Sequence, residues 1–518
     1  MTHPATPSAG RDKGTWLRLW AGAAMLVGAA AYVGYEAWGQ PHLLIIVIAG
    51  VVGMYMAMNI GANDVANNVG AAVGSGALTM IGALAIAAVF EAAGAMLAGG
   101  EVVGTIKKGI IDPDLIGDPA VFIRLMLAAL FAAALWINVA TMVGSPVSTT
   151  HSIVGGVLGG GIAAAGFGIV DWGVMGKIAA SWVISPVLGA VIAASFLALI
   201  KAAIVYRKDR VAAAKTWVPI LVAIMGAAFS AYLITKGLKK VWKADVATII
   251  AFVGASFFVI YFIVRPMVVM ASKTLKNTRE DIGKLFTIPL IISAAMLCFA
   301  HGSNDVANAI GPLAAIINSI SGGGVAAKVA IPFWVMVVGA LGLSVGLALY
   351  GGRMVKRVGK EITELDRLRA FTVALSSAIT VIVASGLALP VSSTHIALGA
   401  IFGIGFLREY LENEADKVRI IREHFNDDTE PSLFDTAKGE IEWRHAVLDR
   451  ALKDLLPERE RIFYFEATKK AEQAVMKWER KKLVRRSHLR TIVLAWLITV
   501  PATATIAAAL YFIFRLFI

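Results

Sequence analysis

The sequence predicts an all-α polytopic membrane protein with two inverted-topology repeats, broken helices, re-entrant hairpins and a small helical cytoplasmic insertion. The first observation is composition: 58% of the 518 residues are hydrophobic, 16% are charged and the mean hydropathy is +0.74, whereas soluble domains are about 45–50% apolar. The second is a series of long apolar runs. The third is a pair of polar motifs that each occur twice, in the same order.

Eleven apolar runs are long enough to cross the hydrocarbon core, which takes about 20 helical residues. They are predicted to be helices, because a helix satisfies its own backbone hydrogen bonds in lipid and the runs lack the alternation of barrel strands. The first is predicted to be retained, since "YEAWGQ" after it offers no small-residue cleavage site. Shorter apolar stretches after residues 150 and 394 are candidates for re-entrant segments. The eleven runs lie near residues 17–37, 42–60, 78–99, 120–143, 176–205, 217–235, 246–264, 286–301, 330–350, 370–389 and 491–517.

Paired motifs indicate an internal duplication. "GANDVANN" (61–68) recurs as "GSNDVANA" (302–309), 241 positions later, and "PVSTTH" (146–151) recurs as "PVSSTH" (390–395), 244 positions later. In a weaker pair, "WVISP" and "WLITVP", the prolines are 315 positions apart, so the second half contains an insertion. Duplicated halves around one central site are typical of secondary transporters, and they favour inverted topology here.

These landmarks divide the chain into six parts. The insertion is the long polar stretch, and its helical spacing of apolar residues between charges predicts a small helical unit in water. The parts are an N-terminal tail with an extra transmembrane helix (1–39), a first transport repeat (40–206), a connector with two transmembrane helices (207–285), a second transport repeat (286–407), the cytoplasmic helical insertion (408–488) and the last transmembrane helix of the second repeat (489–518).

The formal net charge of +13 does not indicate nucleic-acid binding, because Lys and Arg cluster beside the apolar runs, as in "YRKDR" (206–210) and "KWERKKLVRRSHLR" (477–490). The positive-inside rule explains these clusters and predicts a cytoplasmic insertion in a multi-pass plasma-membrane (inner-membrane) protein. Cys298 is the only cysteine, so no intramolecular disulfide can form, and we expect it to serve in packing.

The first motif carries an aspartate into each half of the membrane domain, Asp64 and Asp305. A charged side chain at the bilayer centre costs about 2.5–3.5 kcal/mol on insertion scales, so each needs a partner or a bound cation. Flanking glycines and Pro312 predict a helix break that frees backbone carbonyls. Together with carboxylate and amide oxygens, these suit a hard cation such as Na⁺. The alternative is an Asp–Asn network that only joins helices.

The second motif supplies hydroxyl groups after a helix-breaking proline. Unpaired N–H groups and the helix dipole at the start of the following helix favour an anion. Two such ends facing one another would surround a tetrahedral oxyanion with donors, although a Ser or Thr after Pro is also an ordinary N-cap. The hydroxyl residues are Ser148, Thr149 and Thr150 in the first half and Ser392, Ser393 and Thr394 in the second.

Four further residues are candidates for coupling the transported ion. His151 and His395 end the hydroxyl motifs and could bind the anion, carry a proton or simply hold the hairpin together. Glu91 has no carboxylate counterpart in the second half when "GG" at 99–100 is matched to "GG" at 351–352, which favours a cation or proton role. Asn138 is an equal candidate for the site and for helix–helix hydrogen bonding.

The motifs "GANDVANNVGAAVGSGALT", "HGSNDVANAIGPL" and the pair "PVSTTH"/"PVSSTH" closely resemble the inorganic phosphate transporter (PiT) family, whose members symport phosphate with Na⁺ or H⁺. The likeness spans about 40–205, 286–407 and 490–517. It implies that the Ser/Thr hairpin tips bind phosphate and that the Asp/Asn motifs coordinate Na⁺, with the aspartates also contacting phosphate. The Asp/Asn residues are Asn63, Asp64, Asn67, Asn304, Asp305 and Asn308.

Several alternatives stay open from the sequence. The chain is predicted to be a symporter that imports phosphate with Na⁺, or H⁺, by alternating access. A sulfate or metal–phosphate symporter of the same fold is the nearest rival, and a passive anion channel is a remote one. An intramembrane hydrolase is disfavoured, because every polar element is duplicated while a catalytic triad needs one nucleophile and one base, so no enzyme and no cofactor are expected. A homodimer is one of the assembly states left open.

Overall fold

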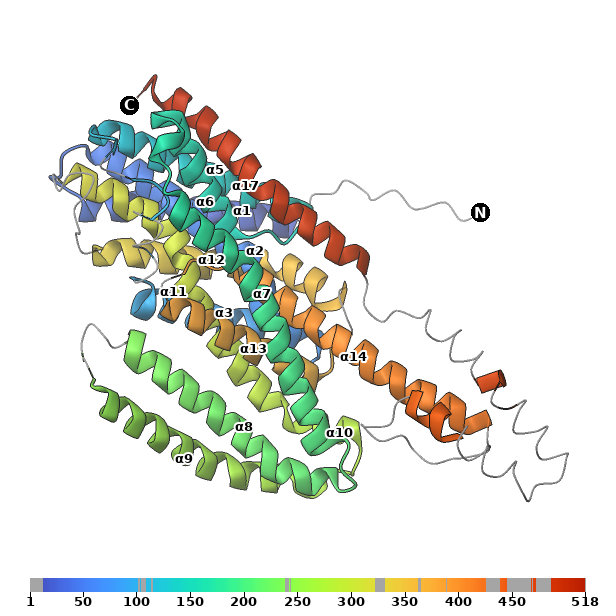
Figure 1. Ribbon diagram of the computed structural model, residues 1–518. Helices are drawn as coiled ribbons and strands as arrows, with labels where there is room; N and C mark the ends of the chain where they lie inside the picture. Colours follow the sequence, from blue (N-terminus) through green and yellow to red (C-terminus); the bar gives the residue numbers. More distant parts are fainter. Residues whose placement is uncertain are drawn as a thin grey trace, which may run out of the picture.

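The computed structural model describes residues 13–100, 109–112, 115–237, 244–321, 331–361, 365–387, 389–424, 438–444 and 486–517, with a few single positions between them. Within these ranges the regular structure is helical, apart from one isolated β-bridge between Ile111 and Val170. Eleven of the described helices are long and apolar enough to span a membrane, as predicted, so the chain is a multi-pass membrane protein (Figure 1).

The helices of the first half and connector begin with α1 (Lys13–Glu36), α2 (Leu43–Gly74) and α3 (Met80–Ala98), followed by α5 (Pro119–Val143), α6 (Thr149–Ala165), α7 (Trp172–Ile200), α8 (Arg210–Tyr232), α9 (Val246–Ala271) and α10 (Arg279–Leu285). Those of the second half are α11 (Thr287–Ile320), α12 (Phe333–Glu361), α13 (Arg367–Gly386), α14 (Ser393–His424) and α17 (Arg486–Phe514). In the connector, α8 and α9 lie side by side at one edge of the bundle, and Val268 is the one buried residue of α9.

The two halves exchange partners rather than packing as separate bundles. Helix α2 packs against α12 and α11 packs against α3. Glycines permit the closest approaches: a methyl group added at Gly61 would lie 2.1 Å from the carbonyl oxygen of Leu343, and one at Gly302 would lie 2.1 Å from the carbonyl oxygen of Glu91. Because Gly61 and Gly302 are equivalent in the repeat, these two helix crossings are equivalent as well.

A second exchange involves the helices that follow the hydroxyl motifs. Helix α6 packs against α17, and α14 packs against α7. A methyl group at Gly159 would lie 2.1 Å from the Ala504 carbonyl oxygen, and one at Gly403, the equivalent position 244 residues later, would lie 2.3 Å from the Ala190 carbonyl oxygen. Each half therefore completes the packing of the other around the centre of the molecule.

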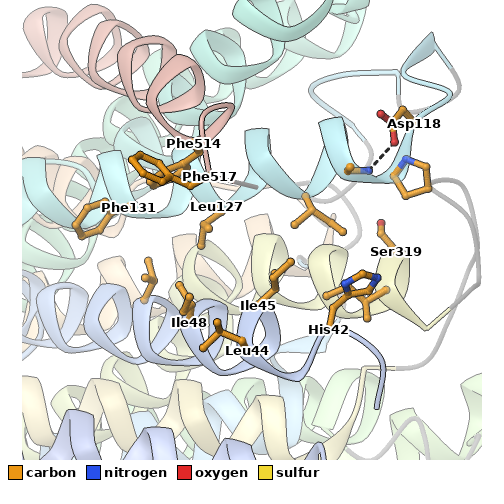
Figure 2. Close-up of a pocket in the computed structure, with 15 residues that line it drawn as sticks. His42, Leu44, Ile45, Ile48, Asp118, Leu127, Phe131, Ser319, Phe514 and Phe517 are labelled. Atoms are coloured by element: carbon orange, nitrogen blue, oxygen red, sulfur yellow. Dashed lines mark hydrogen bonds between the residues drawn. The ribbon is translucent and has the colours of Figure 1, made fainter.

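The two motif helices run in opposite directions. The first residues of α2 and the last residues of α11 line the same groove of about 930 Å³, together with the start of α5 and the end of α17. Figure 2 shows His42 and Ser319 at one end of this groove and Phe131, Phe514 and Phe517 at the other. An antiparallel α2–α11 pair is what two inverted repeats require.

Two helical hairpins bring the hydroxyl motifs into the interior. The first descends along α5, turns at Gly144 in the left-handed conformation (φ 71°), and returns along α6. The second consists of α13 and α14. Their tips contact one another reciprocally, since the Thr150 hydroxyl donates to the Val391 carbonyl (3.0 Å) and the Thr394 hydroxyl lies 3.4 Å from the Val147 carbonyl oxygen.

The predicted break in the motif helices is wrong. Helix α2 continues through residues 61–68 and α11 continues through residues 302–309 and Pro312. The motif glycines serve close helix packing, as the 2.1 Å positions above demonstrate, rather than unwinding the backbone. Pro312 is accommodated inside α11, as prolines in membrane helices often are when neighbouring helices pack around them.

The insertion is described only in part. Helix α14 runs on past residue 407 to His424, and near its end Ile421 packs against Ala471 while Arg422 forms an ion pair with Glu440 (3.0 Å). Residues 425–437 and nearly all of 445–485 lie outside the described part, so the predicted small helical unit is not assessed there. The described portion joins the hairpin tip to the insertion by one continuous helix.

Candidate functional site

The two Asp/Asn motifs meet in the centre of the bundle, where α2 and α11 cross. All six motif residues and all six hydroxyl residues are buried, with no more than 5% of any side chain exposed. The residues that the sequence singled out for cation and anion binding therefore form one enclosed cluster. It contains two carboxylates, four amides and six hydroxyl groups.

Asp64 and Asp305 are linked by hydroxyl groups from both hairpins. The Thr149 hydroxyl donates to Asp64 Oδ2 at 3.0 Å and lies 3.4 Å from Asp305 Oδ2. From the second hairpin, the Thr394 hydroxyl donates to Asp64 Oδ1 (2.9 Å) and the Ser393 hydroxyl donates to Asp305 Oδ2 (2.9 Å). Each carboxylate thus receives hydroxyl groups from both halves, 85 to 330 residues apart in the sequence.

The seventh residue of each motif, Asn67 or Asn308, makes the same kind of contact in the two halves. Asn67 Nδ2 donates to the Thr394 hydroxyl (2.9 Å), and Asn308 Nδ2 donates to the Thr150 hydroxyl (3.2 Å). Each amide reaches across to the hairpin of the other half. The cluster therefore has the two-fold character that the sequence repeat predicted for its parts.

Asn63 and Asn304 fasten the hairpin backbones to the motif helices. Asn63 Oδ1 accepts from the Val147 N–H (3.2 Å), and its Nδ2 donates to the Thr141 hydroxyl (2.9 Å). Asn304 Nδ2 donates to the Val391 carbonyl (3.0 Å) and its Oδ1 accepts from the Ser385 hydroxyl. These two amides position the tips, so they are engaged in holding the structure of the site.

The first hydroxyl residue of each motif is an N-cap. The Ser148 hydroxyl accepts from the His151 N–H (3.1 Å), and the Ser392 hydroxyl accepts from the His395 N–H (3.2 Å). The histidine rings meet edge-on with their centroids 4.4 Å apart, and the His151 ring also packs on Trp182 at 3.7 Å. The tips are therefore held by caps and ring packing, while the hydroxyl groups that reach the carboxylates belong to the next two residues.

The sequence analysis missed His301, which lies fully buried one turn before Asp305. Its Nε2 atom lies 3.0 Å from Asp305 Oδ2 and 3.7 Å from Asp64 Oδ2, and its Nδ1 atom lies 3.3 Å from Glu91 Oε1. A comparison of the two repeats could have identified this residue. The position equivalent to His301 in the first half is Ile60, so only the second half has a polar residue there.

Glu91 joins this side of the cluster, whereas Asn138 does not. Glu91 Oε1 accepts from Asn68 Nδ2 at 2.7 Å and faces His301. Asn138 instead donates to Asn59 Oδ1 (2.9 Å), a helix–helix hydrogen bond outside the carboxylate cluster.

The cluster is chemically suited to a cation next to an oxyanion. One ligand atom each from Asp64, His301 and Asp305 lie within 4.8 Å of one another. Carboxylate, amide and hydroxyl oxygens are the ligands that hard cations prefer. The hydroxyl groups and the N-terminal ends of α6 and α14 can donate to an anion.

Comparisons with known proteins return phosphate transporters and permeases. A family model described as "Phosphate transporter family" matches residues 60–507. A "Putative phosphate permease" of Helicobacter pylori (strain J99) is 46% identical over 503 residues, which cover 94% of this chain and 93% of the relative. A protein of the same description from Haemophilus influenzae is 39% identical over 370 residues, covering 70% of this chain and 87% of the relative.

One solved structure is similar along almost the whole chain. It is described as "The sodium-dependent phosphate transporter" and matches with a TM-score of 0.72 and 32% sequence identity. The match covers 92% of this chain and 100% of that one. The helical arrangement described above is therefore shared with that protein.

Proposed function

The chain belongs to the phosphate transporter family, and from this premise we propose that it imports inorganic phosphate by symport with Na⁺ through alternating access. Thr149, Thr150, Ser393 and Thr394 provide hydroxyl donors for phosphate, assisted by the capped tips at Ser148 and Ser392. Asp64 and Asp305, with the amide oxygens of their motifs, bind Na⁺ and accept a hydrogen bond from protonated phosphate.

The observation that carries the proposal is the position of the Thr149 hydroxyl between Asp64 and Asp305, each of which also accepts from a hydroxyl of the second hairpin. A phosphate dianion brought beside two carboxylates meets repulsion of about 4 kcal/mol per pair of unit charges at 4 Å and an effective dielectric constant near 20. Cations must therefore enter with the anion. Na⁺ suits these oxygen ligands, and the sodium dependence stated for the similar structure supports the same ion.

The arrangement of the halves supports alternating access. The motif helices are antiparallel and the hairpins exchange partners, as expected for repeats related by an axis in the membrane plane. The cluster is buried, and the tips of the two hairpins contact one another beside it. The basic segments beside the spans favour a cytoplasmic location for the end of α14 and the insertion, in the plasma (inner) membrane.

Phosphate is favoured over sulfate because it carries a proton near neutral pH. The carboxylates of Asp64 and Asp305 can accept a hydrogen bond from HPO₄²⁻, whereas SO₄²⁻ has no proton to donate and would face them with acceptors only. A site with two buried carboxylates beside the anion therefore discriminates between the two tetrahedral ions.

The test is uptake of radiolabelled phosphate by proteoliposomes, with Na⁺ and pH gradients imposed separately. We expect uptake driven by Na⁺, inhibited by excess arsenate and not by sulfate, and reduced at least about 100-fold in Asp64→Asn and Asp305→Asn, which corresponds to about 2.7 kcal/mol. Asp171→Asn is the matched control, because Asn is as good an N-cap for α7 as the Asp171 carboxylate that caps it now.

Two results would contradict the proposal. Uphill uptake driven by the pH gradient alone would replace Na⁺ by H⁺ as the coupling ion. Phosphate flux that follows only its own gradient would identify a channel instead of a symporter.

A further inference from the structure

The two-fold cluster has an asymmetric side, formed by three residues whose counterparts in the repeat are apolar. The equivalence is structural as well as sequential, because Gly61 meets Leu343 as Gly302 meets Glu91. The asymmetric residues are Asn68, Glu91 and His301, and their buried counterparts are Ala309, Leu343 and Ile60, respectively.

This side carries two buried oxygen atoms that the protein does not satisfy. Among the described residues, neither Glu91 Oε2 nor Asn68 Oδ1 has a hydrogen-bond partner. The two side chains are hydrogen-bonded to each other, since Asn68 Nδ2 donates to Glu91 Oε1 at 2.7 Å. Both are buried, with 0% of Glu91 and 1% of Asn68 exposed. An unsatisfied buried acceptor costs about 1–3 kcal/mol, so two in one pair indicate that something else binds there.

We propose that Asn68 and Glu91 form an additional Na⁺ site beside the two-fold cluster, called the Asn68–Glu91 site below. It deepens the proposed function and rests on it, because its ion would be transported together with phosphate. One carboxylate and one amide oxygen are ligands suited to a hard monovalent cation. His301 connects this site to the centre, because its two ring nitrogens face Glu91 on one side and Asp305 on the other.

The asymmetry gives the site a distinct consequence. Ligands contributed by the duplicated motifs come in pairs, so ions held by them can be shared by the two halves. The Asn68–Glu91 site occurs once, and its mirror position is filled by Leu343 and Ala309. It therefore adds one cation per transport cycle, held by residues of α2 and α3 and linked to α11 through His301.

The experiment measures the number of Na⁺ ions that accompany each phosphate, from ²²Na⁺ and ³²P uptake by the same proteoliposomes. We expect the ratio to fall by one in both Asn68→Ala and Glu91→Gln, and the Hill coefficient for Na⁺ to fall with it. Asn59→Ala is the matched control on the same helix. Its side chain is also buried, but both of its polar atoms have partners, because Nδ2 donates to the Tyr55 carbonyl and Oδ1 accepts from Asn138.

Binding to purified protein provides a second readout for variants that do not transport. Equilibrium dialysis with ²²Na⁺ should find one bound ion fewer per chain in both variants than in the wild-type protein and in Asn59→Ala. An unchanged number of bound and transported ions would overturn the inference. So would a wild-type H⁺ flux with phosphate that disappears in Glu91→Gln while the Na⁺ ratio stays constant, because the occupant would then be a proton.

The same data separate this inference from the proposed function. If the wild-type protein shows no Na⁺-driven phosphate uptake, the symport proposal fails. If the wild-type protein is driven by Na⁺ and the two variants keep its ratio, only the Asn68–Glu91 site fails.

Discussion

At the scale of single residues, the most informative group is the hydroxyl of Thr149. It donates to Asp64 and lies 3.4 Å from Asp305, and Asn308 Nδ2 lies 3.4 Å from it as well. A hydroxyl group has one proton and two lone pairs, so it can serve both a carboxylate and an amide, or rotate toward an arriving oxyanion. This versatility explains why a threonine lies between the two aspartates.

Replacing Thr149 by Val tests this role while conserving shape. We expect the apparent affinity for phosphate to fall about tenfold or more, because a hydrogen bond to a charged group contributes about 1.5–3 kcal/mol and a factor of ten corresponds to about 1.4 kcal/mol. The measurement is the phosphate concentration dependence of Na⁺-driven uptake. Thr380→Val is the control, since the Thr380 hydroxyl is equally buried but donates only to Ser376 of its own helix. Equal affinities in the two variants would exclude Thr149 from the phosphate site.

A second residue-scale prediction concerns His301. Its removal in His301→Ala leaves Asp64, Asp305 and Glu91 without the one group that faces all three. We expect transport to fall at least about tenfold and partial recovery in His301→Gln, whose amide can donate to one carboxylate. Uptake rates at saturating phosphate provide the measurement, and transport at the wild-type rate in His301→Ala would contradict this assignment.

At the scale of helices, the glycines of the motifs determine how closely α2, α3, α11 and α12 approach. A methyl group at Gly302 would lie 2.1 Å from a backbone oxygen of Glu91 and 2.7 Å from its Cα atom. Because backbone atoms cannot rotate away, α11 and α3 would have to separate. The same crossing holds Glu91 next to His301, so helix packing and the asymmetric side of the site depend on one contact.

Gly302→Ala is therefore expected to destabilise the protein by about 1–3 kcal/mol, the usual cost of overpacking, and to lower uptake. Gly254→Ala is the matched control in α9, where no atom lies within 4 Å of the added methyl group. That variant should be neutral or more stable by up to about 1 kcal/mol, because alanine loses less backbone freedom in a helix. Thermal unfolding in detergent measures both, and equal melting temperatures would show that α3 and α11 can separate freely.

At the scale of the whole molecule, the two hairpins close the site by meeting tip to tip. The reciprocal contacts of Thr150 with Val391 and of Thr394 with Val147 join residues from different halves, and the rings of His151 and His395 pack together beside them. In the proposed alternating access, these contacts separate during the transport cycle. Helix α14 would transmit such a shift to the insertion that it enters. The cytoplasmic location of the insertion and the homodimer stay predictions.

Linking the tips should stop transport. The variant carries His151→Cys and His395→Cys in a Cys298→Ala background, which is available because Cys298 is the only cysteine of the chain. A short bifunctional thiol reagent is expected to reduce uptake at least about tenfold, and each single-cysteine protein treated in the same way is the control. Transport that continues after complete cross-linking would mean that the tips move together through the cycle.

The sequence by itself determined the class of protein, the eleven apolar spans and the pairing of the polar motifs, whereas the residues that bind phosphate and Na⁺ stay a prediction. The spans and the paired motifs are local or repeated along the chain, so hydropathy and motif spacing contain them. Only the tertiary structure decided that α2 and α11 run unbroken through their motifs. It also decided that the Thr394 hydroxyl donates to Asp64, 330 residues away in the sequence, and that His301, Glu91 and Asn68 form the asymmetric side of the cluster. These depend on which helices lie against each other, and that is fixed by close backbone contacts at glycines between segments far apart in the sequence.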